Sequence, residues 1–505
     1  MLGQRPNPST LTTETWDLIV IGGGITGAGV LLEAARRGHR VLLLEQRDFA
    51  WGTSSRSSKM VHGGLRYLGQ GDIRLTRHSL LERERLLKEL PDMVIRQPYI
   101  FPIRRGRFPG RWPMKAVLWL YDFLAGIRDH RWLSVDKLLA LVPGLSAEGL
   151  VGAMRYTDAL TDDSRLVARV LHEGCGHGGR ACNYVEVGKV THDGNLLTVA
   201  ANDLVGEGAA LTFRARHVIN ATGAWADRLS GTEKKVRPQR GSHLFVPAER
   251  LPVDDCLTIL HPEDGRPVFV FPWEGLTCIG TTDLDHRDDL SFEPWCTRQE
   301  VDYLLKLVNS QFPKVGLQDA DIISTMAGVR PIIASGKGVD PSKERRDHAV
   351  WEKDGVVTVS GGKLTTFRLI ALDALLASGL IDGDDHGTSQ APVDAMFRFV
   401  VAPPHRLGHP LAPVPQGGDL LEQIEWVLDH EMVVHLDDLL LRRTRVGNLL
   451  PNGAAALLGD IKSLCQQKLG WDEAEWEQEV ARYQDIVCRY YGLPQAVADR
   501  VANAA

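Results

Sequence analysis

The fold is decided by the stretch Trp16-Asp17-Leu18-Ile19-Val20-Ile21-Gly22-Gly23-Gly24-Ile25-Thr26-Gly27 near the start of the chain. Residues 16–21 form the short apolar run that is typical of a buried parallel strand, and the glycines follow it directly. Residues 28–37 then have a helical pattern, and a second apolar strand over 40–45 ends in an acid. This order of strand, glycine turn, helix, strand and acid is the fingerprint of a dinucleotide-binding βαβ unit.

The glycines of this fingerprint have distinct physical roles. Gly22 makes the tight turn, Gly24 lets the backbone approach a pyrophosphate, and Gly27 allows the helix to pack closely on the strand. The start of the helix offers N–H groups to a phosphate. Glu45, at the end of the second strand, suits a ribose hydroxyl. The alternative is a glycine-rich turn that arises by chance.

Three further features favour FAD over a nicotinamide cofactor. The chain has no second G-x-G-x-x-G, so we expect no electron exchange with NAD(P). Residues 53–59 are rich in hydroxyl groups, which suit a long diphosphate and a flavin edge, although a solvated loop would also have this composition. A strand over 217–220 runs into the turn Ala221-Thr222-Gly223, which is similar to a recurrent element of flavoproteins with two dinucleotide-binding domains.

The composition excludes several classes of protein. The chain has 505 residues, 44% of them hydrophobic and 24% charged, which predicts two to four globular domains. Its formal charge of −6 argues against a nucleic-acid partner. None of the seven cysteines forms a C-x-x-C pair, so we expect no iron–sulfur cluster and no metal site. The polar first 15 residues and the lack of an uncharged apolar run of ~18 residues predict a cytoplasmic protein.

A family resemblance rests on the segment Ser54-Ser55-Arg56-Ser57-Ser58-Lys59-Met60-Val61-His62-Gly63-Gly64-Leu65-Arg66-Tyr67-Leu68. This segment closely resembles the FAD-dependent glycerol-3-phosphate dehydrogenases of the D-amino-acid-oxidase-like superfamily. Further matching blocks follow in family order at residues 161–167, 220–223, 240–243, 279–283, 328–331, 361–366, 429–431, 437–438 and 442–445. The resemblance is continuous over about 16–378 and looser over 425–490.

The resemblance implies an α/β fold in which a Rossmann-type FAD-binding domain is interleaved with a mixed-sheet substrate domain, followed by a small C-terminal helical domain. We expect the first two domains within residues 16–378, the flavin parts being about 16–100, 150–235 and 345–378 and the substrate part about 236–344. A Pro- and Gly-rich linker would span 379–418, where family members usually carry a longer helical stretch. Residues 419–505 would form the helical domain, because their apolar residues recur at helical spacing.

The resemblance also implies the reaction, which is oxidation of sn-glycerol 3-phosphate to dihydroxyacetone phosphate by hydride transfer to flavin N5. A phosphate is best held by guanidinium groups. The candidates are Arg66, Arg330 and Arg346, with Arg345 as an alternative in register. Each arginine could instead be a structural ion-pair partner.

A base that works near neutral pH is most simply a histidine. His243 and His62 both lie in matched blocks, and His243 is the preferred base. His62 would instead contact the isoalloxazine or the phosphates. Lys363 could stabilise negative charge on the reduced flavin, or it could contribute only fixed charge at the start of a helix.

The expected cofactor contacts lie in the turns and strand ends of the matched blocks. They are Gly22, Gly24, Ile25, Thr26, Gly27, Glu45, Gln46, Thr53, Ser54, Ser55, Ser58, Lys59, His62, Gly63, Gly64, Val185, Ala221, Thr222, Gly223, Gly328, Arg330, Gly362, Lys363, Leu364, Thr365 and Thr366.

The electron acceptor would be a quinone or oxygen. Residues 104–115 hold basic side chains and no acid, and an apolar, aromatic stretch follows over 116–121. Such a segment suits docking to the inner face of the cytoplasmic membrane, where quinone is found, although a buried helix beside a solvated basic loop would look the same. An oxidase that releases peroxide and a flavin-binding protein without turnover are the alternative functions. The sequence leaves a homodimer open.

Overall fold

The computed structural model of the 505-residue chain describes residues 2–69, 71–205, 208–231, 234–334, 347–383, 395–404 and 407–494. Two of the predicted residues, Arg345 and Arg346, lie outside these ranges. The backbone of Arg66 is placed in helix α2 (Leu65–Gly69), and its side chain is outside what the structure describes.

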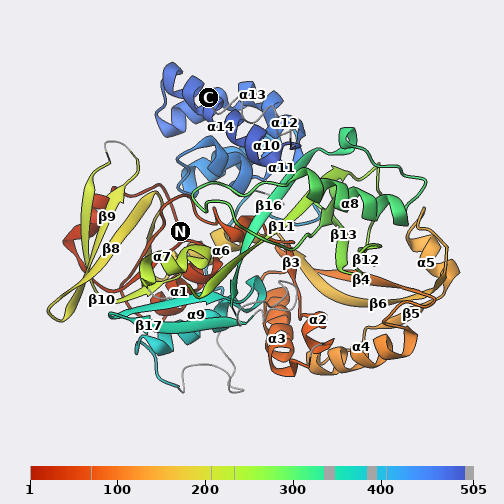
Figure 1. The fold of residues 1–505 in the computed structure, drawn as a ribbon. Helices are drawn as coiled ribbons and strands as arrows, with labels where there is room; N and C mark the ends of the chain where they lie inside the picture. Colours follow the sequence, from red (N-terminus) through yellow and green to blue (C-terminus); the bar gives the residue numbers. More distant parts are fainter. Residues whose placement is uncertain are drawn as a thin grey trace.

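The fingerprint lies in an eight-stranded sheet, the flavin-side sheet (Figure 1). Strand β1 (Thr15–Ile21) pairs in parallel with β2 (Val41–Leu44) and with β10 (Ala210–Asn220). The other strands are β7 (Arg180–Cys182), β8 (Val185–Asp193), β9 (Leu196–Asp203), β17 (His348–Lys353) and β18 (Val356–Gly361). The expected fold class is therefore confirmed.

The two faces of β1 belong to two different cores. Leu18 and Val20 pack in a cluster with helices α1 (Ile25–Ala35), α6 (Asp163–Gly176) and α9 (Phe367–Ala377). Ile19 and Ile21 face a second cluster, which side chains of β8, β9 and β10 complete. Successive side chains of a strand point to opposite faces, so an unbroken apolar run is required where both faces are covered.

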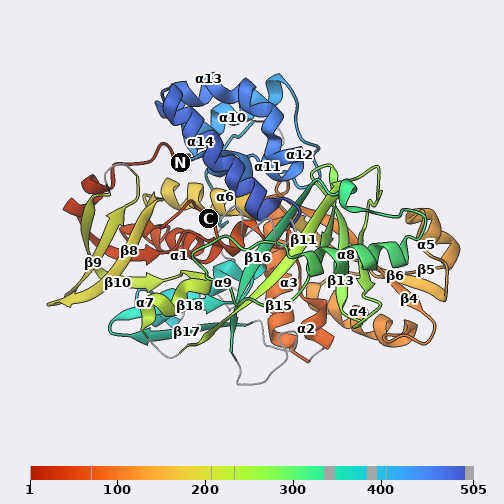
Figure 2. The ribbon, with the colours of Figure 1, turned by 45° about the horizontal axis from the view of Figure 1, so that its top comes forward.

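A second, ten-stranded sheet forms the substrate-side half (Figure 2). Its order begins β15-β11-β14-β13-β12-β4-β6-β3, with β16 paired to β11 and β5 to β6. All of the pairs recorded within it are antiparallel except β12 with β4, so the sheet is mixed. Its strands are β3 (Met60–Val61), β4 (Val94–Arg104), β5 (Arg131–Leu133), β6 (Leu150–Thr161), β11 (Val236–Pro247), β12 (Cys256–Leu260), β13 (Pro267–Trp273), β14 (Leu276–Gly280), β15 (Leu284–Asp285) and β16 (Ser324–Ile333).

Strands from distant parts of the chain meet in this sheet. The sequence analysis expected residues 16–100 and 150–235 in the flavin part, and β3, β4 and β6 from these ranges pair in the ten-stranded sheet, while the division into domains stays a prediction. Residues 94–104 and 150–161 form a long antiparallel pair that continues from β12. The alternating pattern of a strand predicts a half-buried face, but the pattern does not say which sheet the strand will join.

Helices cover the outer parts of the substrate-side half. They are α3 (Ile73–Glu89), α4 (Arg111–Ala125), α5 (Val135–Leu141) and α8 (Arg298–Gln311), and short α7 (Ala226–Ser230) follows β10 on the flavin side. Among the described helices, none combines the length and the apolar character needed to cross a bilayer.

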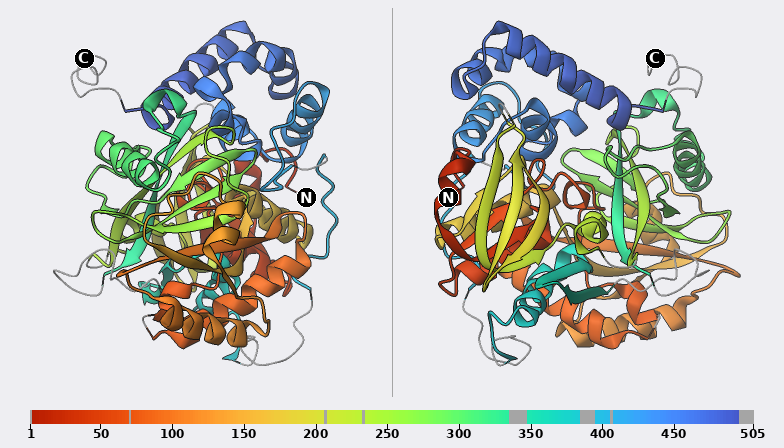
Figure 3. Two further views of the ribbon diagram at one scale, coloured as in Figure 1. Left: turned by 90° about the vertical axis from the view of Figure 1, so that its right-hand side faces the viewer. Right: turned by 60° about the vertical axis from the view of Figure 1, so that its left-hand side comes forward.

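The C-terminal helices lie across the top of both sheets (Figure 3). They are α10 (Gly418–His430), α11 (Val446–Leu449), α12 (Pro451–Ala454), α13 (Leu458–Leu469) and α14 (Glu473–Ile486), with the π-helical turns η8 (Asp438–Arg443) and η10 (Val487–Tyr491). The predicted apolar stripes pack into a core of their own. Met432 is the exception, because it packs in the core of the flavin-side half.

Candidate active site

A cavity of about 380 Å³ opens where the parallel strands end. Ile21 ends β1, and Ala221 follows β10 directly. The carboxyl ends of parallel strands are where α/β sheets bind ligands. Many of the predicted cofactor contacts line this cavity, namely Gly22, Gly24, Ile25, Thr26, Glu45, Gln46, Thr53, Ser54, Val185, Ala221, Thr222, Gly223, Gly362, Lys363 and Leu364.

The glycine turn has the shape that the fingerprint predicts. Gly22 has φ +110°, and a Cβ on it would lie 2.7 Å from the carbonyl oxygen of Ala221. A Cβ on Gly27 would collide with the carbonyl oxygen of Gly22. Gly24 caps the N-terminus of α1 without a side chain, and the N–H of Ile25 donates to Ser54 Oγ at 3.0 Å. The helix start is thus open toward the cavity, as a phosphate site requires.

Glu45 closes the end of the cavity beside β2. Its carboxylate accepts hydrogen bonds from the N–H of Gly23 at 2.6 Å and of Arg47 at 2.8 Å. Burial raises the pKa of Glu45, and the two backbone hydrogen bonds oppose that rise. The carboxyl group is therefore fixed in position where a ribose hydroxyl could donate to it.

Other predicted cofactor contacts do not line the cavity but support its walls. The amino group of Lys59 is buried and donates to Asp163 at 2.7 Å and to the carbonyl oxygen of Ser55 at 2.8 Å. Thr365 Oγ1 accepts from the N–H of His62 at 3.1 Å, which joins two segments of the site. The remaining members of this group are Gly27, Ser58, Gly63, Gly64, Gly328, Arg330 and Thr366.

His243 lies on β11, behind the serine residues that border the cavity. Its Nε2 is 3.0 Å from Ser58 Oγ, and the neighbouring Ser57 lines the cavity. Burial lowers the pKa of His243 to about 3, and the charges of Arg330 and Lys59 act in the same direction. The imidazole is therefore neutral at pH 7 and can accept a proton.

Arg330 lies on β16 beside His243. Its Nη2 donates to Thr281 Oγ1 at 2.9 Å, and its Nη1 donates to Asp283 Oδ1 at 3.2 Å. Asp283 also pairs with Arg266 at 3.3 Å. Two guanidinium groups thus share one carboxylate. Arg330 is both an ion-pair partner and a part of a site suited to an anion.

Two glycines that the sequence analysis did not single out make room for these side chains. A Cβ on Gly280 would overlap the ring of His243, 2.6 Å from Cγ and 2.8 Å from Nε2. A Cβ on Gly241 would collide with the guanidinium of Arg330 and would lie 2.5 Å from Thr281 Oγ1. Both glycines lie inside sequence blocks that match the family, and this position was the signal that could have indicated them. Glycine has no functional group, so the chemistry of the blocks draws attention to the neighbouring residues instead.

Lys363 approaches the site from the opposite wall. Its Nζ lies 4.6 Å from the centroid of the Tyr67 ring. A Cβ on Gly64 would lie 3.1 Å from the same Nζ, so the glycine leaves space for the lysine. Tyr67 was not among the predicted residues, because an aromatic residue three positions after a glycine pair predicts a core contact as readily as a ligand contact.

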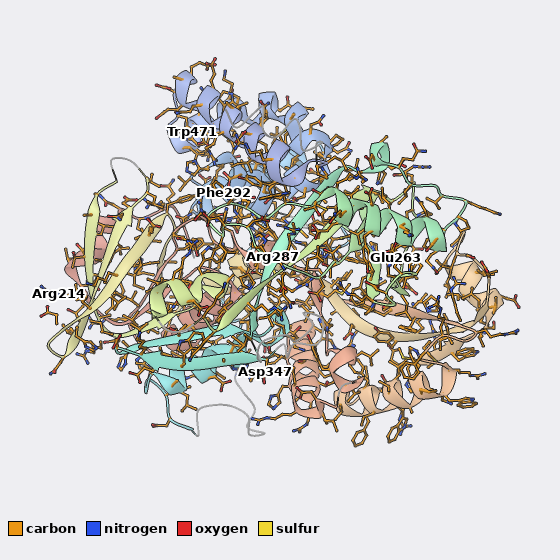
Figure 4. All side chains as sticks on the ribbon, viewed as in Figure 1. Arg214, Glu263, Arg287, Phe292, Asp347 and Trp471 are labelled. Atoms are coloured by element: carbon orange, nitrogen blue, oxygen red, sulfur yellow. The ribbon has the colours of Figure 1, made fainter. Side chains whose placement is uncertain are left out.

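His348 was also not predicted, although Arg346, two residues before it, was a candidate. Its Nε2 lies 2.6 Å from Asp373 and its Nδ1 lies 3.2 Å from Asp347. Burial opposes its charge, but the two carboxylates outweigh burial and raise the pKa to about 9. Asp347, labelled in Figure 4, lies between the flavin-side sheet and α3. His348 is a charged residue that ties β17 to α9 beside the Gly362 turn.

Further residues that were not predicted also line the cavity. Trp51 and Trp225 line it with their ring centroids 5.7 Å apart. Pro331, Arg228 and Val187 also line it. Pro331 lies in the matched block 328–331, whereas nothing in the local sequence indicates the other four residues, because their approach to the cavity depends on the packing of distant segments.

Comparison with known proteins agrees with this geometry. Residues 17–370 match the family described as FAD dependent oxidoreductase, and residues 398–476 match the C-terminal domain of alpha-glycerophosphate oxidase. A glycerol-3-phosphate dehydrogenase of Mycobacterium leprae is 34% identical over 93% of this chain and 88% of its own. The chain belongs to the family of FAD-dependent glycerol-3-phosphate dehydrogenases.

Solved structures of the FAD-dependent family share the fold. The glycerol-3-phosphate dehydrogenase from Bacillus halodurans complexed with FAD has a TM-score of 0.71 and 24% identity, and the match covers 95% of this chain and 96% of that one. The L-alpha-glycerophosphate oxidase from Mycoplasma pneumoniae has a TM-score of 0.59 and 18% identity over 72% and 95% of the two chains.

The cofactor of the family is FAD, and the residues of the cavity fit it. The open N-terminus of α1, the tight turn at Gly22 and the fixed carboxyl group of Glu45 form one continuous wall. A side chain at Gly22 or Gly27 would fill this cradle. The fingerprint residues would hold the pyrophosphate and the ribose of FAD. The turn at residues 362–364 would lie at the other end of the bound cofactor.

Proposed function

We propose that this protein oxidises sn-glycerol 3-phosphate to dihydroxyacetone phosphate and passes the electrons to a membrane quinone. The observation that carries the reaction is a neutral, buried histidine beside two arginines that share one carboxylate. His243 contacts Ser58, and Arg330, which shares Asp283 with Arg266, lies next to it. This pair suits a substrate that has an alcohol and a phosphate close together.

Each of the residues around His243 has its own role in the proposed reaction. Arg330 binds a phosphate oxygen, and Thr281 and Asp283 keep its guanidinium in place. His243 accepts the hydroxyl proton at Nε2, the nitrogen that faces Ser58 in the free protein. FAD, when bound, supplies the acceptor for the hydride that leaves the carbinol carbon.

Substrate binding would also improve the base. The charge of Arg330 contributes to the low pKa of His243. A phosphate dianion placed on Arg330 offsets that charge, so the pKa of His243 rises as the substrate arrives. This rise brings the pKa of His243 closer to the working pH, where a general base is most effective.

The experiment is anaerobic bleaching of the bound flavin. Glycerol 3-phosphate should remove the 450 nm band within one turnover, while glycerol and 2-hydroxy acids should leave it. A flavin that none of these compounds bleaches would contradict the proposal and would favour a flavin-binding role without turnover.

Helix α4 supports a membrane quinone as the acceptor. Trp112, Trp119 and Phe123 are exposed on α4 (68%, 62% and 68%), and Phe108 just before it is 82% exposed. The opposite face of the helix is buried through Met114 and other apolar side chains. The helix therefore has a second apolar face that nothing in the described part of the chain covers.

Basic side chains surround this exposed face. Arg105, Arg107, Arg111 and Lys115 are all exposed, and the guanidinium of Arg111 lies 5.2 Å from the ring of Trp112. Aromatic rings beside cations suit the interface of an anionic bilayer. We infer that α4 docks on the inner face of the cytoplasmic membrane.

Vesicle co-sedimentation tests this docking. Vesicles that contain anionic lipid should retain the protein, and Trp119→Ser with Phe123→Ser should release it. Phe292→Ser is the matched control, since Phe292 is 57% exposed beneath the C-terminal helices and far from α4 (Figure 4). Equal retention of the wild type and the double variant would exclude α4 as the docking surface.

The acceptor is tested separately. A quinone analogue should be reduced at a rate that exceeds oxygen uptake. Peroxide formed in equal amount to dihydroxyacetone phosphate would instead establish the oxidase, an alternative kept open by the match of residues 398–476 to an oxidase domain.

A further inference from the structure

Residues 53–59, the serine loop, contact the catalytic machinery along one side. Ser54 Oγ accepts from the N–H of Ile25 at the start of α1. Ser58 Oγ lies 3.0 Å from His243 Nε2. A shift of this loop would therefore disturb both the phosphate-binding helix and the base.

The opposite side of the serine loop is held by the C-terminal domain. Arg445 Nη2 donates to the carbonyl oxygen of Ser55 at 2.9 Å and to Asp163 Oδ1 at 3.2 Å. Lys59 Nζ donates to the same two acceptors. Asp163 Oδ2 in turn accepts from the N–H of Ser57 at 2.8 Å. The loop backbone is thus fixed at residues 55 and 57 by a cluster that includes Arg445.

A second interaction holds the residue between these two points. Arg56 donates from Nε at 3.2 Å and from Nη2 at 2.9 Å to the hydroxyl oxygen of Tyr491, in η10. Arg56 also pairs with Glu293 at 2.7 Å. Phe292, next to Glu293, lies just beneath the C-terminal helices in Figure 4. Three consecutive residues of the loop are therefore fixed through groups at 445 and 491.

The charge cluster is not complete without the C-terminal domain. Arg445, Lys59, Asp162 and Asp163 have almost no exposed side-chain area. Burial raises the pKa of Glu274, which lies in the same cluster, well above its ordinary value. Arg445 pairs with both Asp162 and Asp163, so its removal would take a cationic partner away from two buried carboxyl groups. Such a change is costly in a low-dielectric interior.

We propose that Arg445 and Tyr491 are positioning residues for catalysis, through which the C-terminal domain holds the serine loop against FAD and His243. The effect on turnover rests on the proposed function, whereas the effect on FAD binding does not. Ordinary domain packing is the competing explanation, and it predicts a fall in stability without a change in catalysis.

The experiment compares two tyrosines of the same domain. Tyr491→Phe removes the acceptor for Arg56. Tyr483→Phe is the matched control, because the Tyr483 hydroxyl donates to the carbonyl oxygen of Gly453 inside the C-terminal core. Arg445→Lys keeps the positive charge but replaces the guanidinium group with an amino group on a shorter side chain. FAD affinity is measured by fluorescence titration, and kcat, KM and the melting temperature are measured for each variant.

Tyr491→Phe and Arg445→Lys should lower kcat about tenfold and weaken FAD binding. KM for glycerol 3-phosphate should stay within about twofold of wild type, because these changes misplace a reacting group and leave the groups that bind the substrate intact. Tyr483→Phe should lower only the melting temperature. The proposal is overturned if Tyr491→Phe folds and retains wild-type kcat and FAD affinity, or if the control variant shows the same decrease in both. If wild-type protein does not turn over glycerol 3-phosphate, the proposed function fails and FAD affinity alone decides this inference.

Discussion

The ring of His243 packs directly on the backbone of Gly280, across the antiparallel pair of β11 and β14. A Cβ at that position would overlap the imidazole. The backbone of one strand thus fixes the position of the proposed base on the next.

Gly280→Ala should therefore impair chemistry more than substrate binding. The methyl group must displace the imidazole, and a displacement of about 1 Å can cost about a hundredfold in rate. Stopped-flow flavin reduction should show a large fall in kcat, while the flavin spectrum stays that of the bound form. A wild-type reduction rate would mean that the ring can move without cost.

Arg330→Ala should raise KM for glycerol 3-phosphate steeply and leave FAD bound. A guanidinium–phosphate interaction in a partly buried site contributes about 1.5–3 kcal/mol, or roughly tenfold or more in KM. Steady-state kinetics measures the change, and Arg298→Ala, which breaks exposed ion pairs with Asp302 and Asp319, is the control. If KM does not change, Arg330 serves only as the ion-pair partner of Asp283.

The rate of flavin reduction should fall at acidic pH, where His243 becomes protonated, and we call this fall the acid limb of the pH profile. The pH of the acid limb should change when the charge at position 330 is removed. The pKa of His243 is about 3 in the free protein, so the base stays deprotonated down to mildly acidic pH. Because Arg330 helps to lower that pKa, Arg330→Gln should raise it and bring the acid limb to higher pH. The limb is measured between pH 4 and 8 at saturating substrate. A limb that does not move would show that burial alone sets the pKa, and His243→Ala should abolish the fast phase.

His348 should stabilise the fold in its charged form. Its folded pKa of about 9 lies above the ordinary value of 6.5, so its contribution is complete below about pH 6.5 and is lost as the pH rises through 9. His348→Gln should lower the melting temperature by about 1–2 °C at pH 6 and have little effect at pH 10. Thermal unfolding at the two pH values measures this difference, and an equal decrease at both would show that charge is not involved.

The nucleotide end of the cavity could be predicted because its signals are local. The turn at Gly22, the open helix start and Glu45 all lie within one βαβ unit, whose sequence pattern spans about thirty residues. Even here the helix begins at Ile25 rather than at residue 28, because the first turn of α1 carries glycine and threonine in place of an apolar stripe.

The substrate end was predicted only in part. His243 and Arg330 have functional groups that chemistry can select, whereas Gly241 and Gly280 act only by leaving space. Tyr67, Trp51 and Trp225 reach the site through the packing of segments far apart in the chain, and their position depends on strand pairing across long stretches of sequence. The place of β4 and β6 in the ten-stranded sheet depends on the same kind of long-range pairing.

The first residues of the chain hydrogen-bond to the backbone of His430 and Met432, while Arg445 and Tyr491 hold the serine loop. During synthesis the flavin fingerprint leaves the ribosome hundreds of residues before these partners do. Its strands and α1 can pair early, but the serine loop obtains its final hydrogen bonds only when the chain is nearly complete. Translation products that stop before residue 445 would thus contain a recognisable FAD cradle without the interactions that close it, and tight FAD loading would distinguish finished molecules from unfinished ones.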